Sequence, residues 1–473
     1  MSNAAPVIWW VRRDLRLGDN PTLSEALSIG GSVIPVFILD EVFETYGACP
    51  LWRFGLGAEH FADTLKKAGS RLIFRRGNAA EVLTDLTRET GAKAVRWTRA
   101  YDPDQVARDR SVKSALTDLG VEAKSVAGHL LFEPWSVETK TGDFYKVYTP
   151  FWRSVKDRIV ASPQKRPDNL KPPSLWPESE RIADWALDGA MRRGAEIVRP
   201  HLNVGEAAAQ KRLSEFVEHR IAGYGEMRDV PGKDGTSRLS ENLAWGEISP
   251  RTCWHAGMRA LHEGKAGAEV FLKELVWREF AYHLVWHTPR IVSGNWREEW
   301  DAFPWNENES TPEVTAWKRG RTGIRFVDAA MREMYVTGHM HNRARMIVAS
   351  YLTKHLMSHW RIGQKWFEDC LADWDPASNA MGWQWSAGSG PDATPYFRVF
   401  NPETQLDKFD KDRSYHDRWI AEGQRRPSAE ALSYFDAIPE GWRLSPNDAY
   451  PKPIVAADEG RRRALAAYEH RDF

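Results

Sequence analysis

The sequence predicts a Rossmann-like α/β domain with a parallel sheet, followed by a larger all-α domain. Short runs rich in β-branched residues alternate with helix-like segments in the first part of the chain, a pattern typical of a parallel sheet. From residue 201 onward, apolar residues recur at helical spacing and strand-like stretches almost vanish. We therefore expect an α/β domain over residues 1–127, an interdomain linker over 128–200 and an all-α domain over 201–473.

The first domain should contain strands at residues 7–11, 32–39, 71–75, 94–97 and 121–126. Helices are expected between them at 22–27, 52–68, 79–90 and 103–119. Gly69, Gly91 and Gly120 follow the last three of these helices, at the position where helices commonly end. Neither G-x-G-x-x-G nor G-x-x-x-x-G-K-[ST] follows the first strand, so the usual dinucleotide and phosphate-loop signatures are missing.

The linker is predicted from its prolines, which recur between residues 161 and 178 and block both helix and central strand. After the linker, apolar positions at helical spacing predict helices at 205–222, 268–287, 325–335, 341–360 and 364–370. The second domain should therefore be entirely helical.

The composition excludes several classes of protein. Basic and acidic side chains number 65 each, so any contact with nucleic acid must be a local patch. No run approaches the ~20 apolar residues of a membrane-spanning helix, and the opening MSNAAP lacks a signal-peptide pattern, so we expect a soluble intracellular protein. Cys49, Cys253 and Cys370 lie far apart, which fits a reducing compartment and leaves too few thiolates for a four-cysteine iron–sulfur cluster.

A turn-rich loop at residues 224–251 is the first candidate site. Thr236, Ser237 and Arg238 precede a possible short helix at 239–243. Backbone N–H groups, hydroxyls and an arginine at a helix start can bind an anion such as a diphosphate. The same residues are also compatible with an ordinary capped surface turn.

Two helical segments carry the next candidates. Glu274, Trp277 and Arg278 fall on one side of a helix, where a carboxylate and an indole could bind and stack a flat heterocycle. The alternative is a Glu274–Arg278 surface ion pair with Trp277 in the core. Further along, Asn342 and Met346 share a helix face and could grip a pyrimidine pair.

Metal binding is not predicted. His339 and His341 have no third ligand at useful spacing. Asp373, Asp375 and Asn379 precede Trp383 and Trp385, and paired aspartates can bind a metal or cap a loop. Arg345 is the expected charge partner of Asp373, which argues further against a metal.

Taken together and in this order, W-R-E-F, M-H-N-R-x-R-M, G-W-Q-W and P-Y-F-R-x-F-N-P resemble the photolyase/cryptochrome family, as does the opening IWWVRRDLRLGDNPTL. The resemblance is closest to the bacterial cyclobutane pyrimidine dimer (CPD) DNA photolyases, with the class III branch as a candidate. It implies light-driven repair of CPDs by electron transfer from excited reduced FAD to the flipped-out dimer. The alternatives are a cryptochrome-like blue-light photoreceptor that signals through a partner and, more remotely, an unrelated flavoprotein or Trp-rich helical binding module.

The resemblance also implies site residues. The loop around the FAD diphosphate would comprise Tyr224, Thr236, Ser237, Arg238, Leu239 and Ser240, and the remaining FAD contacts would be Phe271, Arg278, Asn342, Arg345, Asp373, Asp375 and Asn379. Asp375 would face the polar edge of the flavin. Asn379 would lie opposite flavin N5, where plant cryptochromes typically have Asp.

The dimer site implied by the resemblance consists of Glu274, Trp277, Asn342, Met346 and Trp385; (6-4) photolyases instead place histidines at the positions of Asn342 and Met346. Photoreduction of oxidised flavin would use Trp383, Trp360 and Trp305, the last of which requires a two-residue gap in the match. DNA would be bound by Arg228, Trp277, Arg343, Trp385 and Arg398.

Some residues depart from the family pattern. Phe271 and His339 stand where relatives commonly have Trp, so packing beside the flavin should differ. Gln105 stands where folate-binding relatives have a glutamate. The antenna expected first is 5,10-methenyltetrahydrofolate, with deazaflavin or no antenna as alternatives. We expect a cytoplasmic monomer whose partner is DNA containing CPDs, without a metal or iron–sulfur cluster, and nucleoid-associated when bound to DNA.

Overall fold

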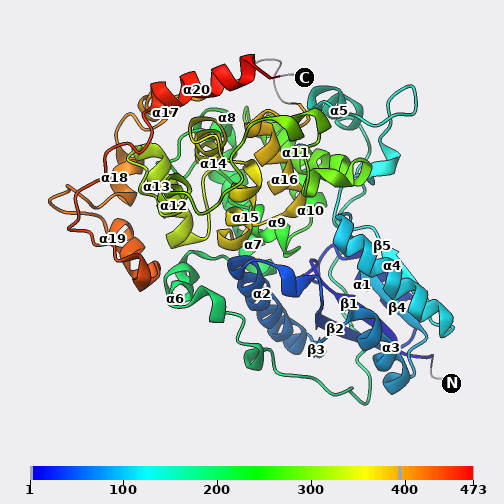
Figure 1. Ribbon diagram of the computed structural model, residues 1–473. Helices are drawn as coiled ribbons and strands as arrows, with labels where there is room; N and C mark the ends of the chain where they lie inside the picture. The colour runs from blue at the N-terminus through cyan, green and yellow to red at the C-terminus, as the bar shows by residue number, and fades with distance from the viewer. Residues whose placement is uncertain (1–3, 393–396, 472) are drawn as a thin grey trace.

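The computed structural model describes residues 4–392, 397–471 and 473. Its α/β part contains one sheet of the strands β1 (Val7–Val11), β2 (Val33–Leu39), β3 (Ile73–Arg76), β4 (Ala94–Thr98) and β5 (Glu122–Val126). The strands are parallel in the order β3-β2-β1-β4-β5, with Val7 opposite both Val33 and Ala94 (Figure 1). The predicted fold class is confirmed, and the strand ends lie within two residues of the predicted positions.

Four helices accompany this sheet: α1 (Pro21–Ser28), α2 (Ala48–Lys67), α3 (Ala79–Thr90) and α4 (Pro103–Asp118). Three begin at capping side chains, since Asn20, Asn78 and Asp102 each accept a hydrogen bond from the first turn of their helix. The sheet is buried on both faces. Trp10 packs with the side of α3 and α4, whereas Trp9 packs with the side of α2.

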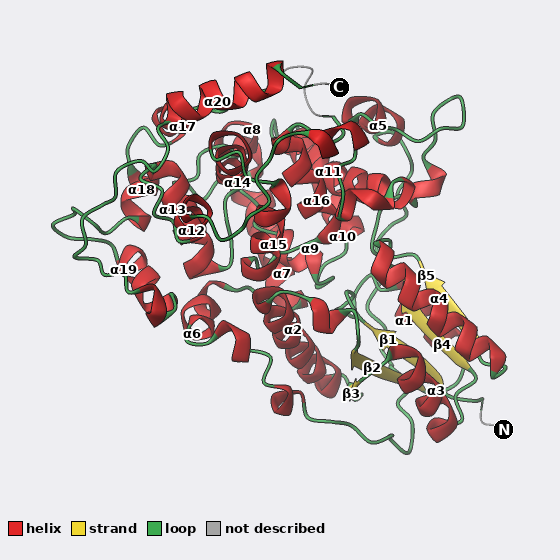
Figure 2. Cartoon of the chain, in the orientation of Figure 1, coloured by secondary structure: helices red, strands yellow, loops and turns green. Residues whose placement is uncertain are grey.

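In the rest of the described chain, helices joined by loops replace strands, as Figure 2 shows. Helix α5 (Tyr148–Val155) lies in the segment between the sheet and the helical part. The helical part contains α6 (Gly194–Val198), α7 (Glu206–His219), α8 (Tyr224–Met227), α9 (Ser240–Ala244), α10 (Pro250–His262), α11 (Ala268–His287), α12 (Pro312–Lys318), α13 (Arg325–Thr337), α14 (Asn342–Ser350), α15 (Trp360–Cys370), α16 (Pro376–Ala387), α17 (Pro402–Phe409), α18 (Ser414–Trp419), α19 (Ala429–Ala437) and α20 (Ala457–Glu469).

The expected continuous helix at 341–360 is wrong. Helix α14 ends at Ser350 and passes into a π-helical turn at Tyr351–His355, which the Leu356 N–H closes on the Tyr351 carbonyl at 3.0 Å. Met357 then has a left-handed φ of 51°, which no α-helix tolerates. His359 caps a new helix, α15, by accepting from the Arg361 N–H. The apolar pattern continues across this break, so it gave no signal of it.

The two parts of the molecule share one hydrophobic core. Trp9 and Phe54 from the α/β part belong to the same buried cluster as Trp245, Trp360 and Trp383 from the helical part. Within the described ranges, no helix combines the length and apolar character needed to cross a bilayer.

Candidate functional site

Helix α11 presents Glu274 beside a cation from another helix. The Glu274 carboxylate forms an ion pair with Arg228 at the end of α8, and the Arg228 guanidinium also lies 5.7 Å from the ring centre of Tyr224. Burial raises the pKa of Glu274, and the charge of Arg228 opposes that rise. Glu274 is therefore a partly buried carboxyl that is hydrogen-bonded to Arg228. Another ligand could replace Arg228 as its partner.

Arg278 does not pair with Glu274, so the surface-pair interpretation is wrong. Its guanidinium donates to the backbone carbonyl of His129 at 2.9 Å and lies 3.4 Å from the buried carboxylate of Glu279. Glu274 instead takes Arg228, which approaches from outside the helix. The i, i+4 spacing permitted a pair that these stronger tertiary partners displaced.

Trp277 stacks against a tyrosine that the sequence did not single out. The Tyr148 ring of α5 lies parallel to Trp277, with ring centroids 3.6 Å apart and an interplanar angle of 6°. Trp277 remains partly exposed, and so does Trp385 on α16, the other indole expected at the dimer. No local sequence signal indicated Tyr148, because α5 was predicted as irregular linker.

Helix α14 begins with Asn342, which is exposed, and Met346 follows one turn later, partly exposed. Arg343 forms an ion pair with Asp229 at 2.8 Å. Arg345 binds both carboxylate oxygens of Asp373, at 2.9 and 2.8 Å, which confirms the expected charge partner. Both bonds come from Nη2, and this charge-assisted pair joins α14 to the residues that precede α16.

Asp375 caps α16 and is bound from three directions. Its carboxylate accepts from the Ser378 N–H at 2.9 Å, from the Tyr282 hydroxyl at 2.5 Å and from the Arg13 guanidinium at 3.0 Å. Burial would raise the pKa of Asp375, but Arg13 and the hydrogen bonds outweigh burial and lower it. Asp375 is therefore a buried ionised carboxylate, and Asn379 lies one turn further along the same helix, donating to the Gln364 carbonyl at 3.1 Å.

The loop expected around a diphosphate leads into α9. Arg238 has a left-handed φ of 51°, its carbonyl accepts from Arg212 at 2.7 Å, and its side chain lies 3.0 Å from Asp234. Leu239 is buried and Ser240 starts α9, one residue later than the predicted short helix. Tyr224 starts α8 and packs 6.2 Å from Phe271, ring centre to ring centre.

A buried ion network behind this loop was missed. Glu241, next to Ser240, is fully buried and accepts from Arg53 of α2 at 2.5 Å, while His339 lies 3.3 Å away. Arg53 also donates to Glu247 at 2.7 Å. Although burial disfavours its charge, these partners lower the pKa of Glu241 to about 2. Arg53 and Glu241 are 188 residues apart, so no spacing could indicate their contact.

The three tryptophans expected to relay electrons are all buried. Trp383 packs on Gly363 of α15, where a Cβ would lie 2.0 Å from the indole. Trp360 begins α15 and donates from its indole N–H to Asn295 at 2.8 Å. The His359 ring lies 5.3 Å from both Trp360 and Trp305, so a histidine stands between the second and third indoles.

The arginines expected on the DNA-binding rim differ in their surroundings. Arg228 and Arg343 are engaged by Glu274 and Asp229 respectively. Arg398 is exposed, 5.8 Å from the ring centre of Phe400. Pro395 and Tyr396, the first two residues of the P-Y-F-R-x-F-N-P motif, lie outside the described residues.

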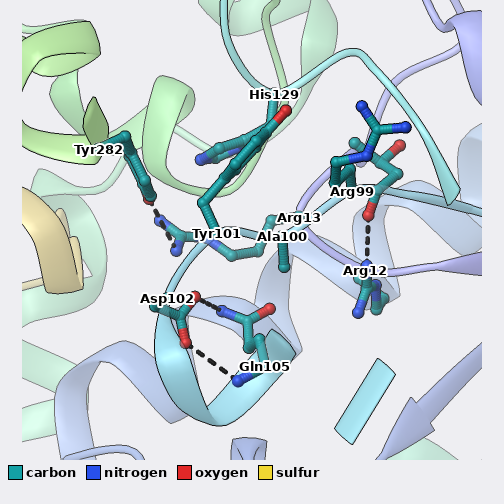
Figure 3. Close-up of a pocket in the computed structure, with 10 residues that line it drawn as sticks. Arg12, Arg13, Arg99, Ala100, Tyr101, Asp102, Gln105, His129 and Tyr282 are labelled. Atoms are coloured by element: carbon teal, nitrogen blue, oxygen red, sulfur yellow. Dashed lines mark hydrogen bonds between the residues drawn. The ribbon is translucent and has the colours of Figure 1, made fainter. Parts of the chain in front are cut away.

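A small cavity lies between the sheet and α11 (Figure 3). Its lining includes Arg12, Arg13, Arg99, Tyr101, Asp102, Gln105, His129 and Tyr282, and its volume is about 20 Å³. Gln105 is buried and donates to Asp102 at 2.6 Å. Burial raises the pKa of Asp102 and, together with the nearby arginines, lowers the pKa of His129 well below its usual value.

The donor set around α14 and α16 fits a flavin cofactor. Asp375 offers an ionised carboxylate that only accepts hydrogen bonds, and Asn379, one turn further along α16, offers an amide that both donates and accepts. These groups suit the N–H and carbonyl groups along the edge of a flavin ring. Among the residues that the structure describes, no group of three or more His, Cys, Asp or Glu is arranged to hold a metal ion.

Comparison with known proteins gives concordant matches. Residues 7–170 match the family described as DNA photolyase, and residues 271–470 match the FAD binding domain of DNA photolyase. The deoxyribodipyrimidine photo-lyase of Agrobacterium fabrum is 43% identical over 98% of both chains. Cryptochrome-2 of Arabidopsis thaliana is 33% identical over 96% of this chain and 77% of its own. A bacterial class III photolyase structure from Agrobacterium tumefaciens aligns with a TM-score of 0.90 at 42% identity, covering 99% of this chain and 98% of the other.

Proposed function

Because the chain belongs to the DNA photolyase family, we propose that it repairs cyclobutane pyrimidine dimers in DNA with blue light. The observation that carries the proposal is that α16 packs against both α11 and α14, and that these three helices bear Glu274, Trp277, Asn342, Met346 and Trp385. Bound in its reduced form, FAD supplies the photoexcited electron that opens the cyclobutane ring and receives it back, so no net redox change results.

The proposed cofactor residues are those implied by the family resemblance, and the contacts around α14 and α16 support them. We assign the flavin ring to the space beside Asn379 and Asp375, and the diphosphate to the loop at 236–240. The ionised Asp375 would accept hydrogen bonds from N–H groups of the ring, because a carboxylate only accepts hydrogen bonds. The Arg345–Asp373 pair holds the backbone of α14 against the start of α16, which fixes Asn342 relative to Asn379.

Glu274 acts on the flipped-out dimer. Burial raises the pKa of Glu274 and so favours its protonated form, which can donate a hydrogen bond to the negative charge that develops on the pyrimidines; such a bond is worth more in a dry site than in water. Trp277 and Trp385 present partly exposed indoles for the two bases. A dimer stacks poorly in duplex DNA, so moving it into the site costs less than moving an intact base pair.

DNA binding needs an exchange of partners at two arginines. Arg228 and Arg343 are held by carboxylates in the free protein, and phosphate oxygens would replace these carboxylates on the damaged strand. Arg398 is exposed and ready for a phosphate contact. We also assign a monomeric state and a cytoplasmic location, where chromosomal DNA is accessible.

The antenna proposed is 5,10-methenyltetrahydrofolate, bound near Gln105 between the two parts of the molecule. The cavity there holds about 20 Å³, room for one water and not for a pterin, so binding requires Arg99 or Tyr101 to move. The adjacent Trp135 is 41% exposed and lies 5.0 Å from Trp286, which offers a stacking surface beside the cavity. Absorbance of the purified protein, and of the pigment released on unfolding, distinguishes folate from deazaflavin or from no antenna.

The decisive experiment uses chemically reduced protein and an oligonucleotide with one thymine CPD. Blue light should restore the two thymines, whereas the dark sample and an oligonucleotide with a (6-4) product should remain unchanged. Absence of repair with fully reduced flavin would contradict the proposal and favour the alternative of a cryptochrome-like photoreceptor.

A further inference from the structure

Tyr148 contacts one of the two indoles assigned to the dimer site. Its ring covers one face of the Trp277 indole in the parallel stack of 3.6 Å and 6°. The tyrosine is itself buried, with 7% of its surface exposed, whereas the indole that it covers remains partly exposed. Tyr148 therefore supports Trp277 from one face while part of the indole stays accessible.

The Tyr148 hydroxyl is anchored to the backbone of the helix that carries Trp277. It donates to the Lys273 carbonyl at 2.7 Å. Lys273 lies four residues before Trp277 in α11, so the same carbonyl also accepts the helical hydrogen bond of the Trp277 N–H. The stack and the hydroxyl bond thus hold Trp277 at both its ring and its backbone.

We propose that Tyr148 is a positioning residue for substrate: it fixes the plane of Trp277, so that this indole receives the dimer without rearrangement. This inference rests on the proposed function, because it assigns Trp277 and Trp385 to the dimer. The energetic reason is preorganisation, since an indole that is already immobile loses less conformational freedom when it binds.

The test measures binding and repair separately in three variants. Tyr148→Leu removes the stack and the hydroxyl, Tyr148→Phe keeps the stack alone, and Phe144→Leu serves as the matched control. Phe144 stacks in parallel on His287, at 4.8 Å and 4°, so it joins the same linker to the same helix away from Trp277. General loosening of the linker would therefore affect Phe144→Leu and Tyr148→Leu equally.

We expect Tyr148→Leu to weaken binding of CPD-containing oligonucleotide about 3- to 10-fold, the factor that corresponds to one aromatic pair. Repair per absorbed photon at saturating substrate should stay within about twofold of the unmodified protein, since no group that touches the reacting atoms changes. Tyr148→Phe should restore affinity to within about twofold, and Phe144→Leu should bind as the unmodified protein does.

Equal affinity of Tyr148→Leu and the unmodified protein would overturn the inference, as would equal losses in Tyr148→Leu and Phe144→Leu. Tighter binding by Tyr148→Leu would also overturn it, because Tyr148 would then occupy space that the dimer needs. An unmodified protein that does not prefer CPD-containing over undamaged DNA would instead refute the proposed function, and this inference with it.

Discussion

Arg13, in the loop after β1, donates to the carboxylate of Asp375 at the start of α16, with 3.0 Å between Nη2 and Oδ2. The α/β part thus supplies the counter-charge for a carboxylate that we assign to the edge of the flavin. Both side chains are nearly inaccessible to solvent, at 7% and 9%. A buried charge that loses its ion-pair partner is strongly destabilising, so this contact joins the two parts energetically.

Replacing Arg13 with Leu should lower the free energy of unfolding by about 3 kcal/mol at pH 7, with partial loss of bound FAD. The pKa of Asp375 is lowered in the folded state, so its contribution is present above the unfolded value of about 4 and is lost as pH falls through the folded value. The difference in the free energy of unfolding between Arg13→Leu and the unmodified protein should therefore become smaller in acid. Urea unfolding at several pH values measures this difference.

A matched control for Arg13 is Arg88→Leu, which breaks the exposed pair with Asp85, whose side chains are 63% and 75% exposed. Surface pairs of this kind contribute about 0–1 kcal/mol. Similar losses of unfolding free energy in both variants would show that the buried Arg13–Asp375 contact stabilises the fold no more than a surface pair does.

Features that depend on neighbouring residues in the sequence could be predicted, whereas features that depend on distant residues could not. The strands were predictable because β-branched runs and the glycines that end helices are local features, and Gly91 has the left-handed conformation expected at such an end. The π-helical turn at Tyr351–His355 was not predictable from the sequence, because apolar residues continue at helical spacing through it. Its existence depends on tertiary packing rather than on any breaker residue.

The candidate functional site shows the same difference between local features and contacts of distant residues. The Arg345–Asp373 pair was predictable because two aspartates beside a tryptophan-rich helix call for a cation, and Arg345 lies on the preceding helix. Arg13 is 362 residues from Asp375, and Arg53 is 188 from Glu241, so only the folded chain brings them together. Tyr148 was not predicted for a different reason, since it begins a short helix, with Pro150 in its first turn, inside a segment that was predicted as irregular linker.

Photoreduction should depend on Trp383. Trp383→Phe replaces an oxidisable indole with a phenyl ring that still packs against Gly363 and Phe367, so the fold should be retained. We expect flavin photoreduction to slow at least about tenfold, since each 1.4 kcal/mol added to a barrier has this effect. After chemical reduction, the variant should repair CPDs normally.

The control for Trp383 is Trp254→Phe, in a separate buried cluster. It should photoreduce at the unmodified rate. If Trp383→Phe also photoreduces at that rate, Trp383 is not the donor next to the flavin, and a path through Trp317, 6.0 Å from Trp383, would need to be considered.

Glu274 should matter for repair and not for flavin binding. Glu274→Ala removes the carboxyl and leaves Arg228 without its partner, so we expect repair per absorbed photon to fall about tenfold, the effect of one charge-assisted hydrogen bond. FAD content should be unchanged. Glu274→Gln keeps a hydrogen-bonding group and should lose less; equal activity of the alanine variant and the unmodified protein would refute the assigned role.

The free energy of unfolding should decrease as pH rises, because Glu279 ionises. This carboxyl is buried in α11 and accepts from the Leu131 N–H at 2.7 Å and the Phe132 N–H at 3.1 Å. Burial raises its pKa to about 7, with Arg278 opposing. A raised folded pKa means that the favourable contribution is complete below the unfolded value and is lost as pH rises through about 7.

Glu279→Gln should therefore flatten the pH dependence of unfolding between pH ~4.5 and about 7, where a shift of this size corresponds to about 3 kcal/mol. Urea unfolding of both proteins across this window provides the measurement. A steep dependence that persists in Glu279→Gln would assign the titration to another group.

Arg398 should contribute to DNA affinity through charge alone. It is exposed beside Phe400, and a phosphate contact there would release about one condensed counterion. Arg398→Ala should therefore reduce the slope of log affinity against log salt concentration by about 0.9, equally for damaged and undamaged DNA. Arg88→Ala, on α3 in the other part of the molecule, controls for the loss of one positive charge. A loss of affinity for CPD-containing DNA alone would contradict the assignment of Arg398 to the DNA-binding rim. Such a loss would place Arg398 against the dimer itself.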